Sequence, residues 1–60
     1  MNMKITIDQS GRIHLRASTG EMTVIPSDYS KAEAQCELIA FCDYLGKDPE
    51  PYFGRLGEFF

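Results

Sequence analysis

Apolar and polar residues alternate along two stretches near the N-terminus. Residues 3–8 read Met-Lys-Ile-Thr-Ile-Asp, and residues 12–18 keep the same period of two, which is typical of half-buried β-strands. The three residues between them, Gln9–Gly11, suit a hairpin loop in which a type I turn is followed by a left-handed glycine. This loop places apolar residues of the two strands opposite one another on one face: Met3 with Ala17, Ile5 with Leu15 and Ile7 with Ile13.

A third strand is predicted over residues 21–25. It ends before Pro26, because proline has no N–H to donate to the strand ladder. A two-residue turn before this strand would add Met22 and Val24 to the apolar face. The first residue of that turn, Thr19, is β-branched and ill suited to the positive φ that the turn requires, so the type of turn stays open.

A helix is predicted over residues 31–45. Ser30 and Glu33 have the spacing of a capping box, and Gly46 suits a left-handed C-cap. Ser27 is a competing start, three residues earlier. One stripe of the helix is apolar and is expected to cover the apolar face of the sheet: Ala34, Leu38, Phe41, Cys42 and Leu45.

A second, short helix or turn is predicted over residues 49–58. The Asp-Pro-Glu sequence at 48–50 supplies an N-cap, a first-turn proline and a first-turn acid. Apolar side chains follow at helical spacing, although two glycines weaken this helix by about 1 kcal/mol each relative to alanine. These side chains are Phe53, Leu56 and Phe60.

Together these elements predict a single α+β domain over residues 1–60. Its architecture is a three-stranded antiparallel β-meander packed against one long α-helix, with a short C-terminal helix or turn. The helix and the sheet bury one core between them.

Neither the size nor the residue types favour an enzyme. A chain of 60 residues has a small core that leaves little volume for a buried pocket. His14 is the single histidine, and no glycine-rich phosphate loop, nucleophile elbow or metal-ligand spacing is present. Cys36 and Cys42 are six residues apart, so on one helix their side chains diverge by roughly 120° and cannot bridge. We therefore expect no catalytic activity, cofactor or metal.

The two cysteines are expected to be reduced thiols, which agrees with a cytoplasmic protein. No apolar run approaches the roughly 20 residues of a membrane span or the core of a signal peptide. We expect a cytoplasmic location without membrane association, in the host cell if the protein is encoded by a phage.

Charge is distributed unevenly along the chain, whose net charge is −3. Residues 1–26 carry three basic and two acidic side chains, whereas residues 27–60 carry three basic and seven acidic ones. The outer sheet face is thus mildly basic, with His14 exposed opposite the neutral Thr6. The candidate phosphate-binding residues on this face are Lys4, Arg12, His14 and Arg16. A nucleic-acid-binding domain is one alternative, although the pI near 4.8 opposes attraction to phosphate and the face equally suits simple solvation.

The outward side of the long helix is acidic, with some apolar residues. A partner could pack against it, because small residues surround one aliphatic side chain and acids lie at the border. The other interpretation is that the second helix folds back over Ile39. The candidate partner-binding residues are Glu33, Glu37, Ile39, Asp43 and Tyr44.

The C-terminal residues are rich in aromatic side chains. Core completion is expected for Phe53 and Leu56, whereas Phe59 and Phe60 are expected to contact a partner or a second copy, since aromatic anchors are common at binding hot spots. A structural homodimer joined through this segment is a further alternative.

These observations favour a non-enzymatic, small acidic protein-binding module. An acidic face fits a partner with a basic surface, such as a nucleic-acid-handling protein or complex that the module would inhibit or modulate. Small, acidic, motif-free proteins suit phage or mobile-element inhibitors, including anti-CRISPR-like proteins. No family motif is present.

Overall fold

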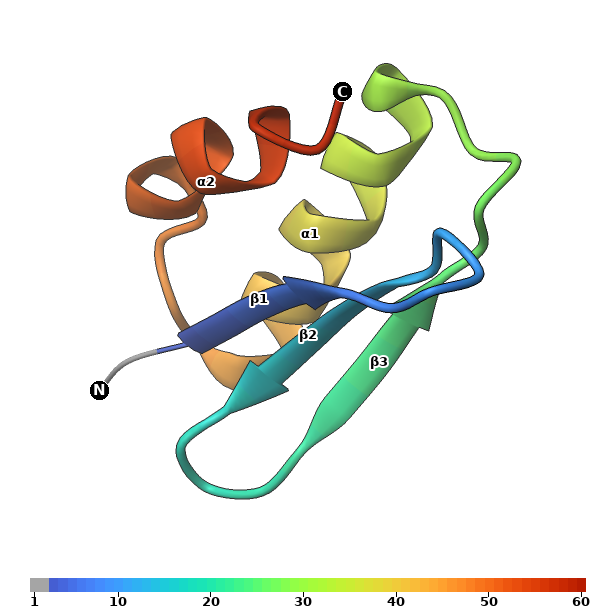
Figure 1. Ribbon diagram of the computed structural model, residues 1–60. Helices are drawn as coiled ribbons and strands as arrows, with labels where there is room; N and C mark the ends of the chain where they lie inside the picture. The colour runs from blue at the N-terminus through green and yellow to red at the C-terminus, as the bar shows by residue number, and fades with distance from the viewer. Residues whose placement is uncertain (1–2) are drawn as a thin grey trace.

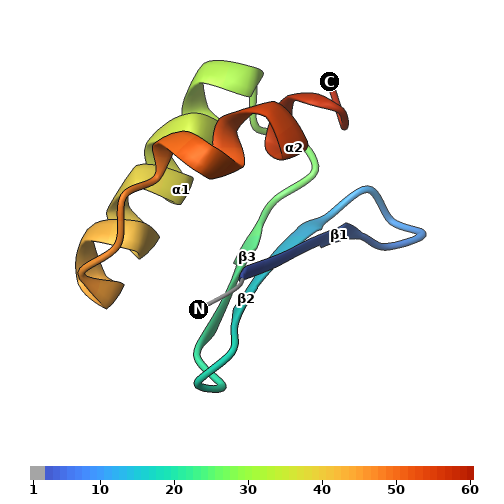
Figure 2. The same ribbon diagram turned by 90° about the vertical axis from the view of Figure 1, so that its left-hand side faces the viewer.

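The computed structural model describes residues 3–60 and has an α+β layout, as predicted. Its elements are β1 (Met3–Ile7), β2 (Ile13–Ala17), β3 (Met22–Ile25), α1 (Lys31–Leu45), the 3-10 helix η1 (Glu50–Tyr52) and α2 (Phe53–Gly57). The strands form one antiparallel sheet in the order β1-β2-β3. Both helices lie over the same face of this sheet (Figures 1 and 2), so the other face is open.

The first hairpin has the predicted register. Lys4 pairs with Arg16 and Ile5 with Leu15. In the loop, the Asp8 N–H donates to the carbonyl of Arg12 at 2.9 Å, and Gly11 has a φ of 87°. Glycine suits this position because a left-handed backbone is costly for residues with a Cβ.

The second hairpin differs from the prediction by one residue. Its loop has three residues, 18–20, because Ala17 pairs with Glu21 through an N–H···O bond of 2.8 Å. Gly20, with a φ of 106°, takes the left-handed position. The two hairpins therefore use the same kind of loop, and Thr19 escapes the positive φ that a two-residue turn would impose.

This shift exchanges the two faces of β3, so the placement of Met22 and Val24 in the core was wrong. They lie on the open face opposite Arg16 and His14 and are 55% and 39% exposed. Ile25 is instead fully buried. A slip of one residue reverses every side chain of a strand, since the side-chain period is two.

Ile7 was also expected in the core but is 45% exposed. It pairs with the buried Ile13, so its register is right. It is the last residue of an edge strand, where fewer neighbours are available to cover a side chain.

Helix α1 begins and ends where its capping residues predict. The Ser30 hydroxyl accepts from the Glu33 N–H, the Glu33 carboxylate accepts from the Ser30 N–H, and Gly46 closes the helix with a φ of 72°. Ser30 rather than Ser27 is therefore the N-cap. The buried side chains of α1 come from the predicted stripe, in which Leu45 is only half-buried: Ala34, Leu38, Phe41 and Cys42.

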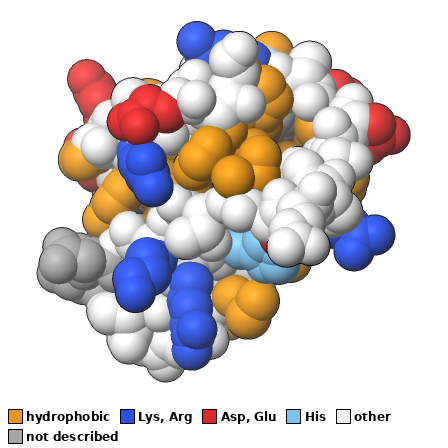
Figure 3. All heavy atoms as spheres, in the orientation of Figure 1, with side chains coloured by type: hydrophobic (Ala, Val, Ile, Leu, Met, Phe, Trp, Pro, Cys, Tyr) orange, Lys and Arg blue, Asp and Glu red, His pale blue; other side chains and the backbone are white. Residues whose placement is uncertain are grey.

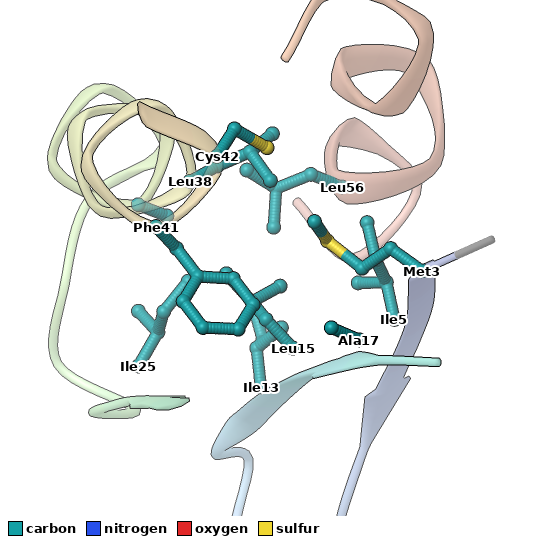
Figure 4. Packing of buried hydrophobic residues seen from close by; sticks show 11 residues of the cluster. Met3, Ile5, Ile13, Leu15, Ala17, Ile25, Leu38, Phe41, Cys42 and Leu56 are labelled. Atoms are coloured by element: carbon teal, nitrogen blue, oxygen red, sulfur yellow. The ribbon is translucent and has the colours of Figure 1, made fainter. Parts of the chain in front are cut away.

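The C-terminal segment is divided between η1 and α2 instead of forming one helix. The Asp48 carboxylate accepts from the Glu50 N–H at 3.1 Å, which fixes the start of the segment. The single fully buried side chain of α2 is Leu56. Figure 4 shows it reaching toward Leu38 of α1 and the sheet residues, so α2 completes the core between the two layers.

Candidate interaction surfaces

The outward side of α1 stays uncovered. We call Glu33, Glu37, Ile39, Asp43 and Tyr44 the outward helix face. Ile39 is 45% exposed and Tyr44 is 75% exposed. The C-terminal segment therefore does not fold back over Ile39, because α2 packs through Leu56 toward the sheet side of α1.

Within this face, Glu33 caps the N-terminus of α1. Its carboxylate accepts from the Ser30 N–H at 2.8 Å, and its own N–H donates to the Ser30 hydroxyl at 3.1 Å. These hydrogen bonds, the backbone one first, lower the pKa of the Glu33 carboxyl. Since this carboxylate caps the helix, the acids left for a partner are Glu37 and Asp43.

Asp43 carries its negative charge at the negative end of the α1 helix dipole. It lies in the last turn of α1, where no basic side chain accompanies it. A negative charge at a helix C-terminus costs about 0.3–1 kcal/mol, and Asp43 has no ion pair with another residue in the range 3–60. Residues kept at a local cost in stability are often functional.

The open side of the sheet combines basic and apolar side chains. We call Lys4, Arg12, His14, Arg16, Met22 and Val24 the outer sheet face. Figure 3 shows basic side chains beside the histidine and an apolar group over the sheet, while the acidic side chains in this view lie in the upper half. Met22 and Val24 lie on this face because the observed register of β3 differs by one residue from the predicted one. The face was predicted to be basic only.

His14 has an acidic partner that the sequence analysis missed. It lies opposite Thr6, as predicted, but its Nε2 is 2.8 Å from Oδ2 of Asp8. Asp8 is the diagonal neighbour of His14 across the hairpin, two residues beyond Thr6, and diagonal neighbours are within reach of long side chains. The pairing could have been inferred from the register alone.

Asp8 organises the first hairpin loop. Its Oδ1 accepts from the Ser10 N–H at 2.9 Å, the Ser10 hydroxyl at 2.7 Å and the Arg12 N–H at 3.0 Å. The contact with His14, followed by those with Ser10, holds the pKa of the Asp8 carboxyl well below its usual value of 3.8. Because hydrogen bonds favour the charged form, this carboxylate stays ionised in mild acid.

Replacing Asp8 with asparagine is expected to destabilise the protein at pH 7, with the difference shrinking in acid. The folded-state pKa of Asp8 is lowered, so its stabilising effect is present above the usual pKa and is lost as the pH falls through the folded-state value. Urea unfolding at several pH values, together with an NMR titration of the Asp8 carboxyl, measures this. Titration at the usual value of 3.8 would contradict the expectation.

A cavity of about 330 Å³ opens at the other end of the sheet. It lies where β1 begins and the β2–β3 loop turns. Among the residues that the structure describes, its lining comprises Met3, Lys4, Arg16, Ala17, Ser18 and Gly20. It could not be predicted from the sequence analysis, because the predicted loop had the wrong length.

The last two aromatic residues differ in their exposure: Phe59 packs against the core, whereas Phe60 is exposed. Phe59 is half-buried against the core, and the Arg55 guanidinium lies 5.1 Å from its ring centre. Arg55 also pairs with Glu58 at 3.0 Å. Phe60 is 53% exposed, which leaves it the more available of the two predicted contact residues.

The two cysteines of α1 lie in different environments. Cys36 is exposed and Cys42 is buried, and both are free. Burial, followed by the charge of Asp48, raises the pKa of the Cys42 thiol, which lowers its reactivity. Between Met3 and Phe60, no three His, Cys, Asp or Glu side chains are grouped to hold a metal ion.

None of the helices in residues 3–60 has the length and apolar character needed to cross a membrane. No family model, curated protein or solved structure matches the chain.

Proposed function

We propose that the protein is a non-enzymatic binding module that docks through the outward helix face onto a Lys- and Arg-rich surface of a larger protein. The observation that carries this proposal is the uncovered Ile39 beside Asp43, an acid kept against the helix dipole. An exposed aliphatic side chain next to acids resembles the centre and rim of a protein interface. Such a module would inhibit or modulate its partner by covering a basic site.

The size of the molecule constrains how it would bind. A stable interface buries about 800 Å² on each partner, which is about a fifth of the 3960 Å² exposed by this chain. The contact would thus extend over most of the outward helix face, including Tyr44. Basic surfaces of this extent are typical of nucleic-acid-handling proteins, so an inhibitor from a phage or mobile element, acting in the host cytoplasm, fits the proposal.

The double variant Glu37→Lys/Asp43→Lys is expected to bind the partner at least tenfold more weakly while remaining folded. Charge reversal places like charges against the basic partner, whereas Asp43→Lys alone should raise helix stability because it complements the dipole. Glu33 is left unchanged, since replacing it would also remove the helix cap. Capture from a lysate of the natural host, quantified by mass spectrometry, and urea unfolding measure the two effects.

A matched control distinguishes a specific effect of the outward helix face on capture from an effect of net charge. Asp28→Lys/Glu50→Lys changes the charge equally at two exposed positions outside the outward helix face and should retain capture. Equal loss with both double variants would show that only net charge matters. Unchanged capture by the Glu37/Asp43 variant would remove the outward helix face from the proposal.

A further inference from the structure

Two cations face one another at the end of the sheet without an acidic partner. Lys4 and Arg16 are directly opposed in the register, and both are exposed. Neither forms an ion pair within the described part of the chain. Like charges in this position destabilise a sheet by up to about 1 kcal/mol, so the arrangement has a local cost.

The nearest acids in the sheet are engaged elsewhere. Asp8 is held by His14 and by the loop residues Ser10 and Arg12. Glu21 accepts a hydrogen bond from the Thr19 hydroxyl, which lowers the pKa of its carboxyl. The positive charge of Lys4 and Arg16 is thus left for an external anion.

The cavity that these two cations help to line has the size and lining of a small-molecule site. Its volume of about 330 Å³ lies at the lower end of ordinary ligand pockets. Met3 and Ala17 give it an apolar wall, while Ser18 and Gly20 contribute the loop. Met22, which is opposite Arg16, extends the apolar surface on the outer sheet face. An anion with an attached organic group fits this combination better than a bare ion does.

We infer that the cavity lined by Lys4 and Arg16 binds a phosphomonoester dianion. Two cations match the charge of −1.5 to −2 that a phosphomonoester carries near pH 7. The guanidinium of Arg16 can bind two phosphate oxygens at once, while Lys4 supplies a point charge. The apolar wall accommodates the organic group. This site lies on the layer opposite the outward helix face and does not depend on the function proposed above.

A nucleic-acid backbone fits the same residues less well. Each phosphodiester carries one charge, and strong binding requires many cations along the strand. The chain has a net charge of −3, so a long polyanion would also be repelled by its acidic helical layer. A compact dianion in the cavity needs only the two local cations.

NMR titration of the full-length, ¹⁵N-labelled protein with phenyl phosphate tests the inference. Saturable shifts are expected for the amides of Lys4 and of residues 16–20, with a Kd of about 0.1–1 mM for a ligand of this size. Benzenesulfonate, a monoanion of similar shape, should bind at least fivefold more weakly, and inorganic phosphate should bind more weakly because it lacks the organic group. The inference is overturned if no saturable shifts occur at phenyl phosphate concentrations up to about tenfold above the expected Kd. It is also overturned if benzenesulfonate binds equally well.

Matched variants locate the site. Lys4→Gln/Arg16→Gln should weaken phenyl phosphate binding at least tenfold and should remain folded, because it removes a repulsion. Lys31→Gln/Lys47→Gln, with the same change in charge away from the cavity, should bind as the unaltered protein does. Equal weakening by both double variants would indicate non-specific attraction and would contradict a site at the cavity.

Further probes identify the source of the phosphate. Adenosine monophosphate represents free metabolites, a phosphoserine peptide represents modified proteins, and a 5′-phosphorylated oligonucleotide represents nucleic-acid ends. Tighter binding of one of these than of phenyl phosphate supports the inference and names the source. If an unphosphorylated oligonucleotide binds as tightly as the phosphorylated one, the site recognises a phosphodiester backbone and the inference is wrong.

Discussion

Replacing Leu56 with alanine is expected to lower the free energy of unfolding by about 2–5 kcal/mol. Leu56 is fully buried and is the one core residue contributed by α2. Its side chain lies between α1 and the sheet (Figure 4), so the truncation leaves a cavity as well as losing apolar burial. A core in a chain of this size rarely contributes more than about 3–5 kcal/mol. A substantial unfolded fraction should therefore be present without denaturant.

Urea unfolding and amide hydrogen exchange measure this loss. Phe60→Ala is the control within the same segment, because Phe60 is 53% exposed and its truncation should change stability by no more than about 0.5 kcal/mol. If Leu56→Ala were as stable as Phe60→Ala, α2 would not be part of the folded core.

Ile25→Ala is expected to be far more damaging than Val24→Ala. Ile25 is fully buried opposite Ile13, whereas Val24 faces solvent opposite His14. The isoleucine truncation should cost about 2–5 kcal/mol, and the valine truncation about 0.5 kcal/mol or less. This pair distinguishes the two registers of β3, because the alternative register buries Val24.

Thermal or urea unfolding of the two variants gives the comparison. Unfolding of both at the same denaturant concentration would contradict the observed register, and so would a larger effect at Val24. A double variant is unnecessary, since the two side chains point to opposite faces of one strand.

The sequence predicted the first hairpin and α1 well because strong local signals agree there. A left-handed glycine and alternating strands define the Met3–Ile7 and Ile13–Ala17 pairing, while Ser30 and Gly46 mark the helix. For the second hairpin, the alternation predicted a two-residue loop and left only the type of turn open. That loop would have paired the apolar residues Ala17 with Met22 and Leu15 with Val24, whereas the observed register pairs Leu15 with Thr23 and keeps Ile13 with Ile25 as its one apolar pair. The apolar pattern therefore favoured the wrong loop, and the poor fit of Thr19 to a two-residue turn was the one local signal against it.

The candidate surfaces were predicted in part. The opposition of Lys4 and Arg16 followed from the register of the first hairpin and is confirmed. The cavity beside them depends on the loop at residues 18–20, whose length was predicted wrongly. The capping role of Glu33 was predicted, but its consequence was overlooked, since a carboxylate engaged at a helix start is a poor candidate for partner binding.

The placement of both helices on one face of the sheet gives the molecule a permanent electric dipole. Lys4 and Arg16 lie on the uncovered side of the sheet, whereas Asp43 is exposed on α1 in the helical layer. A protein approaching a basic surface would be turned so that the helical layer leads, which raises the fraction of productive encounters. The Debye length shortens as salt is added, so this orientation would weaken with ionic strength even where the final contacts are unchanged. In the proposed binding to a basic surface, the two-layer fold would thus govern the orientation of approach as well as the surface that makes contact.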